Sequence, residues 1–178
     1  RDSIDLLIER GRQKFIFVDT AGIKRKKQTQ TRLDKFSVMT ALRTMEKSQI
    51  VLFMLDALEG VSHHDLHLLH LIWEEKRGLI VLVNKWDKMK IAPQNYVRDL
   101  KPQLKELQNI PILCISAKSG SCCEEIWDVI ENLQEGMQRR FTTAKLNAWL
   151  KEVVLSHPLP SYKGREVKLF YGTQVGVN

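Results

Sequence analysis

The chain has 178 residues, of which 43% are hydrophobic, and its 28 Lys and Arg exceed its 21 Asp and Glu, so the formal net charge is +7. This composition supports one substantial hydrophobic core with a small appendage. It excludes a bilayer-spanning protein, because no apolar run approaches the roughly 20 residues of a membrane helix, and a disulfide framework, because there are three Cys. We therefore expect a cytoplasmic protein with reduced thiols and no membrane contact, whose basic charge suits an anionic partner.

A β-hairpin is the first element that the sequence predicts. Two strand-like runs, at residues 4–9 and 14–19, lie on either side of the polar stretch 10–13. We expect one member of this hairpin to form the antiparallel edge of a larger sheet.

The first motif, Asp19-Thr20-Ala21-Gly22, follows the second run. In phosphate-binding sheets an Asp at the end of a strand holds Mg²⁺, usually through water, so Asp19 is the candidate metal ligand. A following Gly brings a backbone N–H close to a terminal phosphate because no Cβ is in the way, so Gly22 is the candidate catalytic position. The basic run at residues 24–27 is either a solvated loop or a contact with RNA or another domain.

Helices and strands alternate through the middle of the chain. Five apolar side chains between residues 33 and 45 share one helical face, a strand follows at residues 50–55, and the next helix carries an apolar face between residues 66 and 73. The polar face of that helix holds His63, His67, His70 and Glu74. Histidines at this spacing can bind zinc, but a solvated polar stripe is the simpler interpretation.

The second motif, Asn84-Lys85-Trp86-Asp87, directly follows the apolar run at residues 79–83, which is predicted to be a buried strand. Open α/β sheets bind ligands at the carboxyl ends of such strands. The Asp87 carboxylate can accept two hydrogen bonds side by side, and guanine offers two adjacent donors where adenine does not. Asp87 would therefore select the base, the Lys85 stem would lie over the base plane, and Asn84 would tie this loop to its neighbours.

The third motif, Ser116-Ala117-Lys118, follows a strand predicted at residues 112–115. The backbone N–H of a small residue at this place can reach the carbonyl group of guanine. A helix with Pro93 near its first turn precedes the strand. Ser121 and Glu124 form a predicted capping box for the helix that follows, whose apolar face lies between residues 126 and 133.

These elements predict an α/β fold with a doubly wound, mostly parallel sheet and right-handed crossovers. We place this first domain at residues 1–138 and a small α+β domain at residues 139–178. The second domain has a predicted helix with apolar residues from Leu146 to Val154, which ends at His157-Pro158, and a predicted strand at residues 166–171.

The three motifs resemble the third, fourth and fifth guanine-nucleotide motifs of translation-factor-class GTPases. The stretches at residues 1–5, 22–26 and 169–174 narrow the resemblance to the second GTPase domain, and the start of the KH-like domain behind it, of the bacterial Der (EngA) family of tandem GTPases. The resemblance implies a P-loop GTPase fold that binds GTP or GDP with Mg²⁺ and hydrolyses GTP. It also implies a switch in the assembly of the large ribosomal subunit, with rRNA as a partner.

The sequence departs from the family pattern at three places. None of the nine Gly is followed by Lys-Ser or Lys-Thr, so the P-loop motif is missing, and the family's switch threonine lies upstream of the segment that matches Arg1. Ile23 replaces the Gln that positions water in many small GTPases, as in a subgroup that is thought to use a monovalent cation near the P-loop. The KH-like part has no Gly-x-x-Gly loop, through which such modules usually clamp RNA.

We therefore expect this chain to be part of a longer GTPase and to hydrolyse little GTP alone. Two alternatives stay open. The chain could be a non-catalytic module that binds guanine or RNA without hydrolysis. It could also resemble the related tRNA-modification GTPases, although Tyr171-Gly172-Thr173-Gln174 argues against them.

Overall fold

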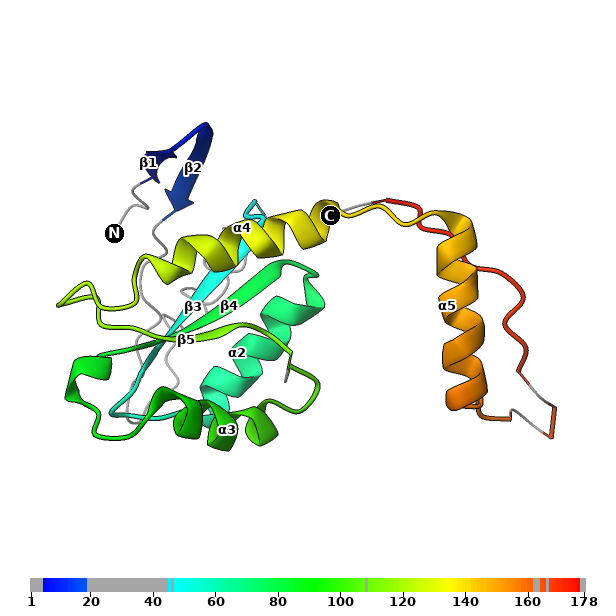
Figure 1. Ribbon diagram of the computed structural model, residues 1–178. Helices are drawn as coiled ribbons and strands as arrows, with labels where there is room; N and C mark the ends of the chain where they lie inside the picture. The colour runs from blue at the N-terminus through cyan, green and yellow to red at the C-terminus, as the bar shows by residue number, and fades with distance from the viewer. Residues whose placement is uncertain are drawn as a thin grey trace, which may run out of the picture. The chain divides into compact units, whose positions relative to one another are not determined.

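A parallel three-stranded sheet forms the centre of the first part of this computed structural model (Figure 1). The structure describes residues 5–18, 45, 47–107, 109–161, 164–165 and 167–176. The chain divides into two compact units, Arg1–Val129 and Ile130–Asn178. In the first unit the strand order is β3 (Ile50–Asp56), β4 (Gly78–Asn84) and β5 (Ile112–Cys114), with both pairs parallel. The predicted α/β fold with a parallel sheet is confirmed.

The central position of β4 in the sheet accounts for its apolar sequence. Residues 78–83 are all buried, because a middle strand has neighbours on both edges and cover on both faces. The pairs Asp56↔Asn84 and Val83↔Cys114 align the carboxyl ends of the three strands at one edge of the sheet. The polar residues that follow these strands are therefore brought together.

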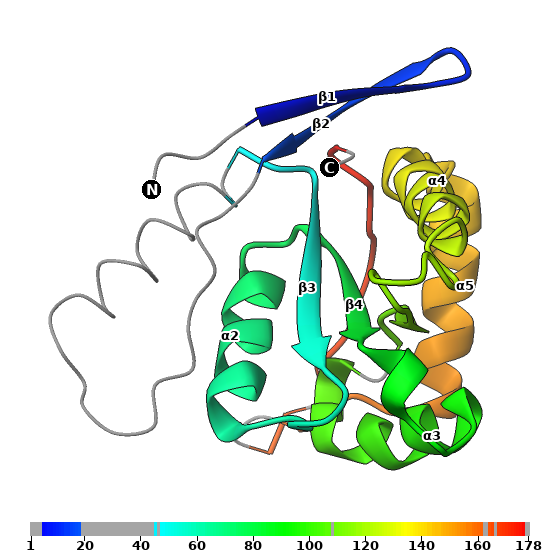
Figure 2. The same ribbon diagram turned by 90° about the vertical axis from the view of Figure 1, so that its left-hand side faces the viewer.

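Helices α2 (His63–Glu74) and α3 (Pro93–Leu104) cover one face of this sheet (Figure 2). Ser62 starts α2 with a capping box that sequence reasoning missed: its hydroxyl accepts the Asp65 N–H at 3.2 Å, and the Asp65 carboxylate accepts the Ser62 N–H at 2.8 Å. Ala92 precedes α3, and Pro93 occupies its first turn as predicted. Two 3₁₀ turns, η1 (Trp86–Lys88) and η2 (Lys105–Leu107), complete this region.

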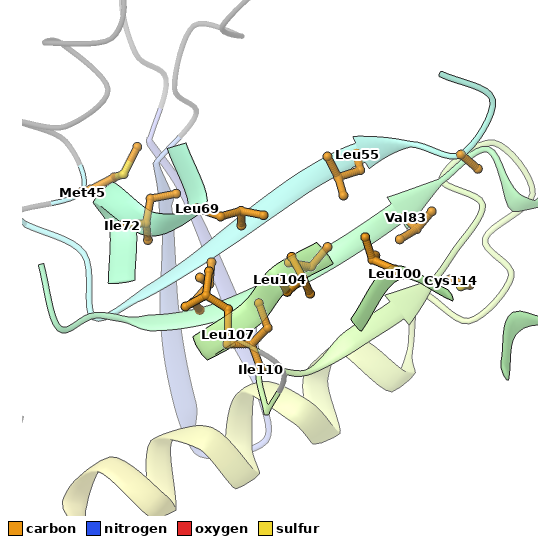
Figure 3. Close-up of a cluster of buried hydrophobic side chains, with 13 residues drawn as sticks. Met45, Leu55, Leu69, Ile72, Val83, Leu100, Leu104, Leu107, Ile110 and Cys114 are labelled. Carbon is orange, nitrogen blue, oxygen red and sulfur yellow. The ribbon is translucent and has the colours of Figure 1, made fainter. Parts of the chain in front are cut away.

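The hydrophobic core lies between these helices and the sheet (Figure 3). Leu69 and Ile72 from α2 and Leu104 from α3 are at most 1% exposed. Met45, the last of the five apolar residues predicted on one helical face, is also buried in this core, whereas residues 33–44 lie outside the described part of the chain. No helix among the described residues is long and apolar enough to cross a membrane.

The predicted hairpin is present, but its place in the sheet was predicted wrongly. Strands β1 (Asp5–Arg10) and β2 (Gln13–Val18) pair with each other around the tight turn at Gly11, whose φ of +59° favours glycine. Within the described residues they form a separate two-stranded sheet, not an edge of the parallel one. The hairpin contacts α4 (Glu125–Gln138) through side chains: the Phe15 and Phe17 rings lie 5.1 and 5.6 Å from the Trp127 ring.

The capping box predicted at Ser121 and Glu124 is also wrong, because α4 (Glu125–Gln138) begins after both residues. The side chains of both residues have other partners. The Ser121 hydroxyl lies 3.8 Å from Cys122 Sγ, and the Glu124 carboxylate accepts a hydrogen bond from Arg10 at 2.8 Å. Glu124 is therefore engaged by a residue far away in the chain, which no local pattern could indicate.

In the second unit, α5 (Thr143–Ser156) matches the predicted helix, and it ends just before His157 and the following proline, as expected. The strand predicted at residues 166–171 is wrong within the described residues, since 167–176 form no strand. Side-chain amides form hydrogen bonds just after this segment: Asn147 accepts the Gly172 N–H at 2.9 Å and donates to the Gly172 carbonyl at 2.7 Å. Gln174 likewise accepts the Phe141 N–H at 2.8 Å and donates to the Arg139 carbonyl at 3.0 Å.

Candidate functional site

The second and third motifs meet at the edge of the sheet where β4 and β5 end. Asn84 is the last residue of β4, Asp87 lies in the 3₁₀ turn after it, and Ser116 follows β5 by two residues. The Trp86 backbone N–H donates to the Ile115 carbonyl at 3.0 Å, which joins the two loops directly. The predicted meeting of these motifs at one edge follows from the parallel register.

Asn84 links the two loops through one side-chain oxygen. Its Oδ1 accepts the Lys85 N–H at 2.8 Å and the Ala117 N–H at 2.9 Å. An Asn oxygen has two lone pairs, so one side chain can serve both loops. The amide therefore fixes the distance between the turn that carries Asp87 and the loop that carries Ala117.

The Ala117 N–H, which sequence reasoning assigned to the guanine carbonyl, is thus engaged by Asn84 in this structure. A carbonyl that arrives at this place would share the N–H with Asn84 or displace it. Shared N–H groups are common in proteins. In this structure the Asn84 side-chain oxygen therefore occupies the acceptor position that a base carbonyl would take at the Ala117 N–H.

Asp87 is oriented by a buried hydroxyl. The Ser116 side chain, which is 1% exposed, donates from Oγ to Asp87 Oδ1 at 2.7 Å and accepts the Ser119 N–H at 3.3 Å. The Ser116 hydrogen bond, aided by the positive charges of Lys88 and Lys118, lowers the pKa of Asp87 below its usual value. Asp87 is exposed and held as a carboxylate, an acceptor for adjacent N–H donors.

Lys85 lies next to Asp87 in an unusual backbone conformation, with φ at +66°. Its ammonium group lies 2.5 Å from Asp56 Oδ2 at the end of β3. Sequence reasoning missed Asp56 and ended that strand one residue earlier. The available signal was a carboxylate directly after an apolar strand, the same signal that singled out Asp19.

The predicted phosphate and metal positions cannot be placed beside these loops. Asp19, Gly22 and the basic run at residues 24–27 lie outside the described residues. Within the described part of the chain, no group of three or more His, Cys, Asp or Glu could hold a metal ion, and this includes the histidine face of α2. Lys118, the last residue of the third motif, is exposed beside Asp87.

The cysteines lie near the site without forming a bridge. Cys114 ends β5, and burial raises the pKa of its thiol to about 11, so it is an unreactive core residue. Cys123 donates to the Ser116 carbonyl at 3.7 Å, and Cys122 is exposed. None of these thiols points to a catalytic role.

Family models match most of the chain. The Elongation factor Tu GTP binding domain matches residues 8–135, and the KH-domain-like module of EngA bacterial GTPase enzymes, C-terminal, matches residues 140–178. The GTPase Der of Natranaerobius thermophilus is 37% identical over 98% of this chain and 40% of its own length. The GTPase Der of Caldanaerobacter subterraneus is 37% identical over 99% of this chain and 41% of its own length.

A solved structure supports the same assignment. A crystal structure of Era in complex with MgGDPNP and a segment of 16S ribosomal RNA is 27% identical, with a TM-score of 0.61, and covers 74% of this chain and 43% of that one. The chain spans about two fifths of the length of the curated relatives that it matches.

Proposed function

Since the chain belongs to the GTP-binding family of elongation factor Tu and, within it, to the Der (EngA) GTPases, we propose that its two joined loops recognise the guanine base of GTP and GDP. One observation carries this proposal. Asn84 ties the loops together while Ser116 orients the Asp87 carboxylate, so acceptors and donors are preorganised at one sheet edge. Preorganised groups lose less entropy when a ligand binds.

Each of the five residues in these loops has a distinct role in this proposal. Asp87 accepts the ring N–H and the exocyclic amine of guanine, and Ser116 orients Asp87. The Lys85 stem packs over the base plane. The Ala117 N–H donates to the base carbonyl, sharing its hydrogen with Asn84. Adenine lacks the pair of donors that Asp87 accepts, so the site discriminates against it.

Hydrolysis in the whole protein follows from the physics of phosphoryl transfer. GTPases position the phosphate and stabilise its charge instead of forming a covalent intermediate. Asp19 would hold Mg²⁺ through water, and the Gly22 N–H would contact the terminal phosphate. Mg²⁺, when bound, neutralises negative charge on the phosphate oxygens. Ile23 has no polar group for the attacking water, so water must be positioned by another group, such as the monovalent cation of the family subgroup.

The partner of the whole protein is proposed to be the large ribosomal subunit and its rRNA in the cytoplasm. Two observations support an RNA partner. The chain carries a net charge of +7, which favours a polyanion. The similar Era structure holds a segment of 16S ribosomal RNA. The non-catalytic alternative has no observation in its favour among the described residues.

A competition experiment tests the base assignment. Fluorescent GDP is bound to a polypeptide in which a Der-type phosphate loop precedes this chain, and GDP or ADP is added as competitor. We expect GDP to compete and ADP to fail at a 100-fold excess. Asn84→Ala should weaken GDP binding, whereas Asn132→Ala, an exposed Asn on α4, should not. Equal competition by ADP would refute guanine recognition.

A further inference from the structure

Asp56 is a charged side chain at the base-binding edge that the proposed recognition of guanine does not use. It ends β3 and pairs in the ladder with Asn84. Its side chain is 19% exposed, and both carboxylate oxygens have partners: Oδ1 accepts the Leu58 N–H at 2.9 Å, and Oδ2 lies 2.5 Å from Lys85 Nζ. Asp56 therefore connects the end of β3 to the side chain of Lys85, the first residue after β4.

The backbone around Asp56 makes its carboxylate a fixed point. The following residue, Ala57, donates its N–H to the Asn84 carbonyl at 2.9 Å, which extends the ladder by one rung. The Asp56 carbonyl accepts the N–H groups of Glu59 at 3.2 Å and Gly60 at 3.1 Å, so a tight turn follows directly. A carboxylate anchored by the ladder, the turn and the Leu58 N–H has little freedom to move.

Lys85 is the mobile partner of this pair. A lysine side chain has a flexible four-carbon stem and loses much rotamer entropy when it is ordered. In this structure the Lys85 side chain is 49% exposed, so packing alone does not fix its direction. The hydrogen bond and the charge of Lys85 lower the pKa of Asp56, and those of Asp56 raise the pKa of Lys85, so both groups stay ionised.

We propose that Asp56 is a positioning residue for nucleotide recognition. By holding the Lys85 ammonium group at the end of β3, Asp56 keeps the aliphatic stem of Lys85 extended along the base site before the nucleotide arrives. This role rests on the proposed recognition of guanine by the same loops. It differs from a stabilising role, because an ion pair this exposed contributes little to folding.

Nucleotide binding gives the first test. The polypeptide with a Der-type phosphate loop ahead of this chain is titrated with fluorescent GDP as wild type, Asp56→Asn, Lys85→Ala and the double variant. Asp56→Asn should raise Kd about 3- to 10-fold, the effect of leaving one rotamer-rich side chain to be ordered on binding. In the Lys85→Ala background the same change should have no effect, because the group that Asp56 positions is absent. Asp99→Asn, which breaks the exposed pair with Arg98 on α3, is the matched control and should leave Kd unchanged.

Lysine reactivity gives a second test that needs no nucleotide. Acylation by a small ester occurs at the neutral amine, so loss of the Asp56 charge should speed the modification of Lys85 in the 178-residue chain. Lys88, an exposed lysine three residues further, is the internal control in the same peptide map and should react at an unchanged rate.

The outcomes separate the two proposals. The positioning role would be overturned if Asp56→Asn left GDP affinity unchanged or raised it. It would also be overturned if Asp56→Asn lowered GDP affinity equally in the presence of Lys85 and in the Lys85→Ala background. Guanine recognition would stand in both cases. An unchanged acylation rate of Lys85 would overturn it as well, because the ion pair would then not exist in solution. Failure of the unaltered protein to bind GDP in preference to ADP would instead refute the proposed function and, with it, the role of Asp56.

Discussion

Replacing Asp87 with Asn is expected to change which base the site accepts. In the structure the Ser116 hydroxyl donates to Asp87 Oδ1 at 2.7 Å. A hydroxyl both donates and accepts, so it can bond either end of an Asn amide and keep the side chain in place. In either orientation, however, the amide has only one oxygen. One of the two guanine donors would therefore meet an N–H group or no partner at all.

The size of this effect follows from the hydrogen bonds. A site built to bond particular polar groups rejects a mispaired ligand by about 10⁴-fold. Xanthine has a carbonyl where guanine has its exocyclic amine, so the amide can pair with it fully. We expect Asp87→Asn to lose most of its affinity for GDP and to prefer xanthosine diphosphate.

The assay is a competition against fluorescent GDP or fluorescent xanthosine diphosphate, with the phosphate-loop polypeptide described above. Ser116→Ala is the matched control. It removes the hydroxyl that orients Asp87, so GDP should bind roughly 10-fold more weakly. The preference for guanine should remain. Unchanged GDP affinity in Asp87→Asn would show that Asp87 does not read the base.

Three further predictions concern other parts of the chain. The 178-residue chain, which contains no Gly-Lys-Ser/Thr sequence, should release phosphate from GTP negligibly in a magnesium-dependent assay, and turnover like that of an intact relative would contradict this. Lys26→Ala with Lys27→Ala should reduce the log–log salt slope of binding to large-subunit particles by about 0.7–0.9 per lost phosphate contact; a pull-down across a salt series with an unchanged slope would assign these charges to solvation. Asn147→Ala removes both hydrogen bonds to Gly172 and should cost about 1–3 kcal/mol in urea unfolding of the chain. Gly172→Ala should cost less, about 1 kcal/mol, because the added Cβ would lie 2.7 Å from Leu150 Cδ1, a methyl group that can move; a larger loss than in Asn147→Ala would refute this ranking.

The local sequence predicted the helices and strands whose formation depends on residue composition and on the periodicity of hydrophobic residues. The strand before Asn84 was recognisable because a central parallel strand is apolar throughout, and the structure extends it by one residue at each end. Helix α3 was predictable from Pro93 and its apolar spacing. Since a motif directly after a parallel strand must lie at the carboxyl edge of the sheet, the meeting of the second and third motifs could also be predicted.

Tertiary structure decided the partners of individual polar groups. The sequence pattern assigned Ser121 and Glu124 to a helix cap, but the Glu124 carboxylate accepts a hydrogen bond from Arg10, 114 residues away in the chain. The pattern at residues 166–171 suited a strand, yet a strand needs a partner, and the described residues 167–171 pair with no other strand. Side-chain amides form the hydrogen bonds next to this segment: Asn147 bonds Gly172, and Gln174 bonds Phe141 and Arg139. A side-chain hydrogen bond depends on which distant residues converge in the fold. The local spacing of hydrophobic and polar residues does not contain that information.

The edge where the base is proposed to bind shows both kinds of information together. Sequence alone singled out Asn84, Lys85, Asp87 and Ser116 as candidates for base recognition, because polar residues that follow apolar strands are visible without a fold. Only the register of β3 against β4 places Asp56 beside Asn84 and within reach of Lys85, 29 residues away in the chain. The physical reason is that a parallel sheet aligns strand ends separated by a whole crossover, so contacts between those ends follow from the pairing of strands.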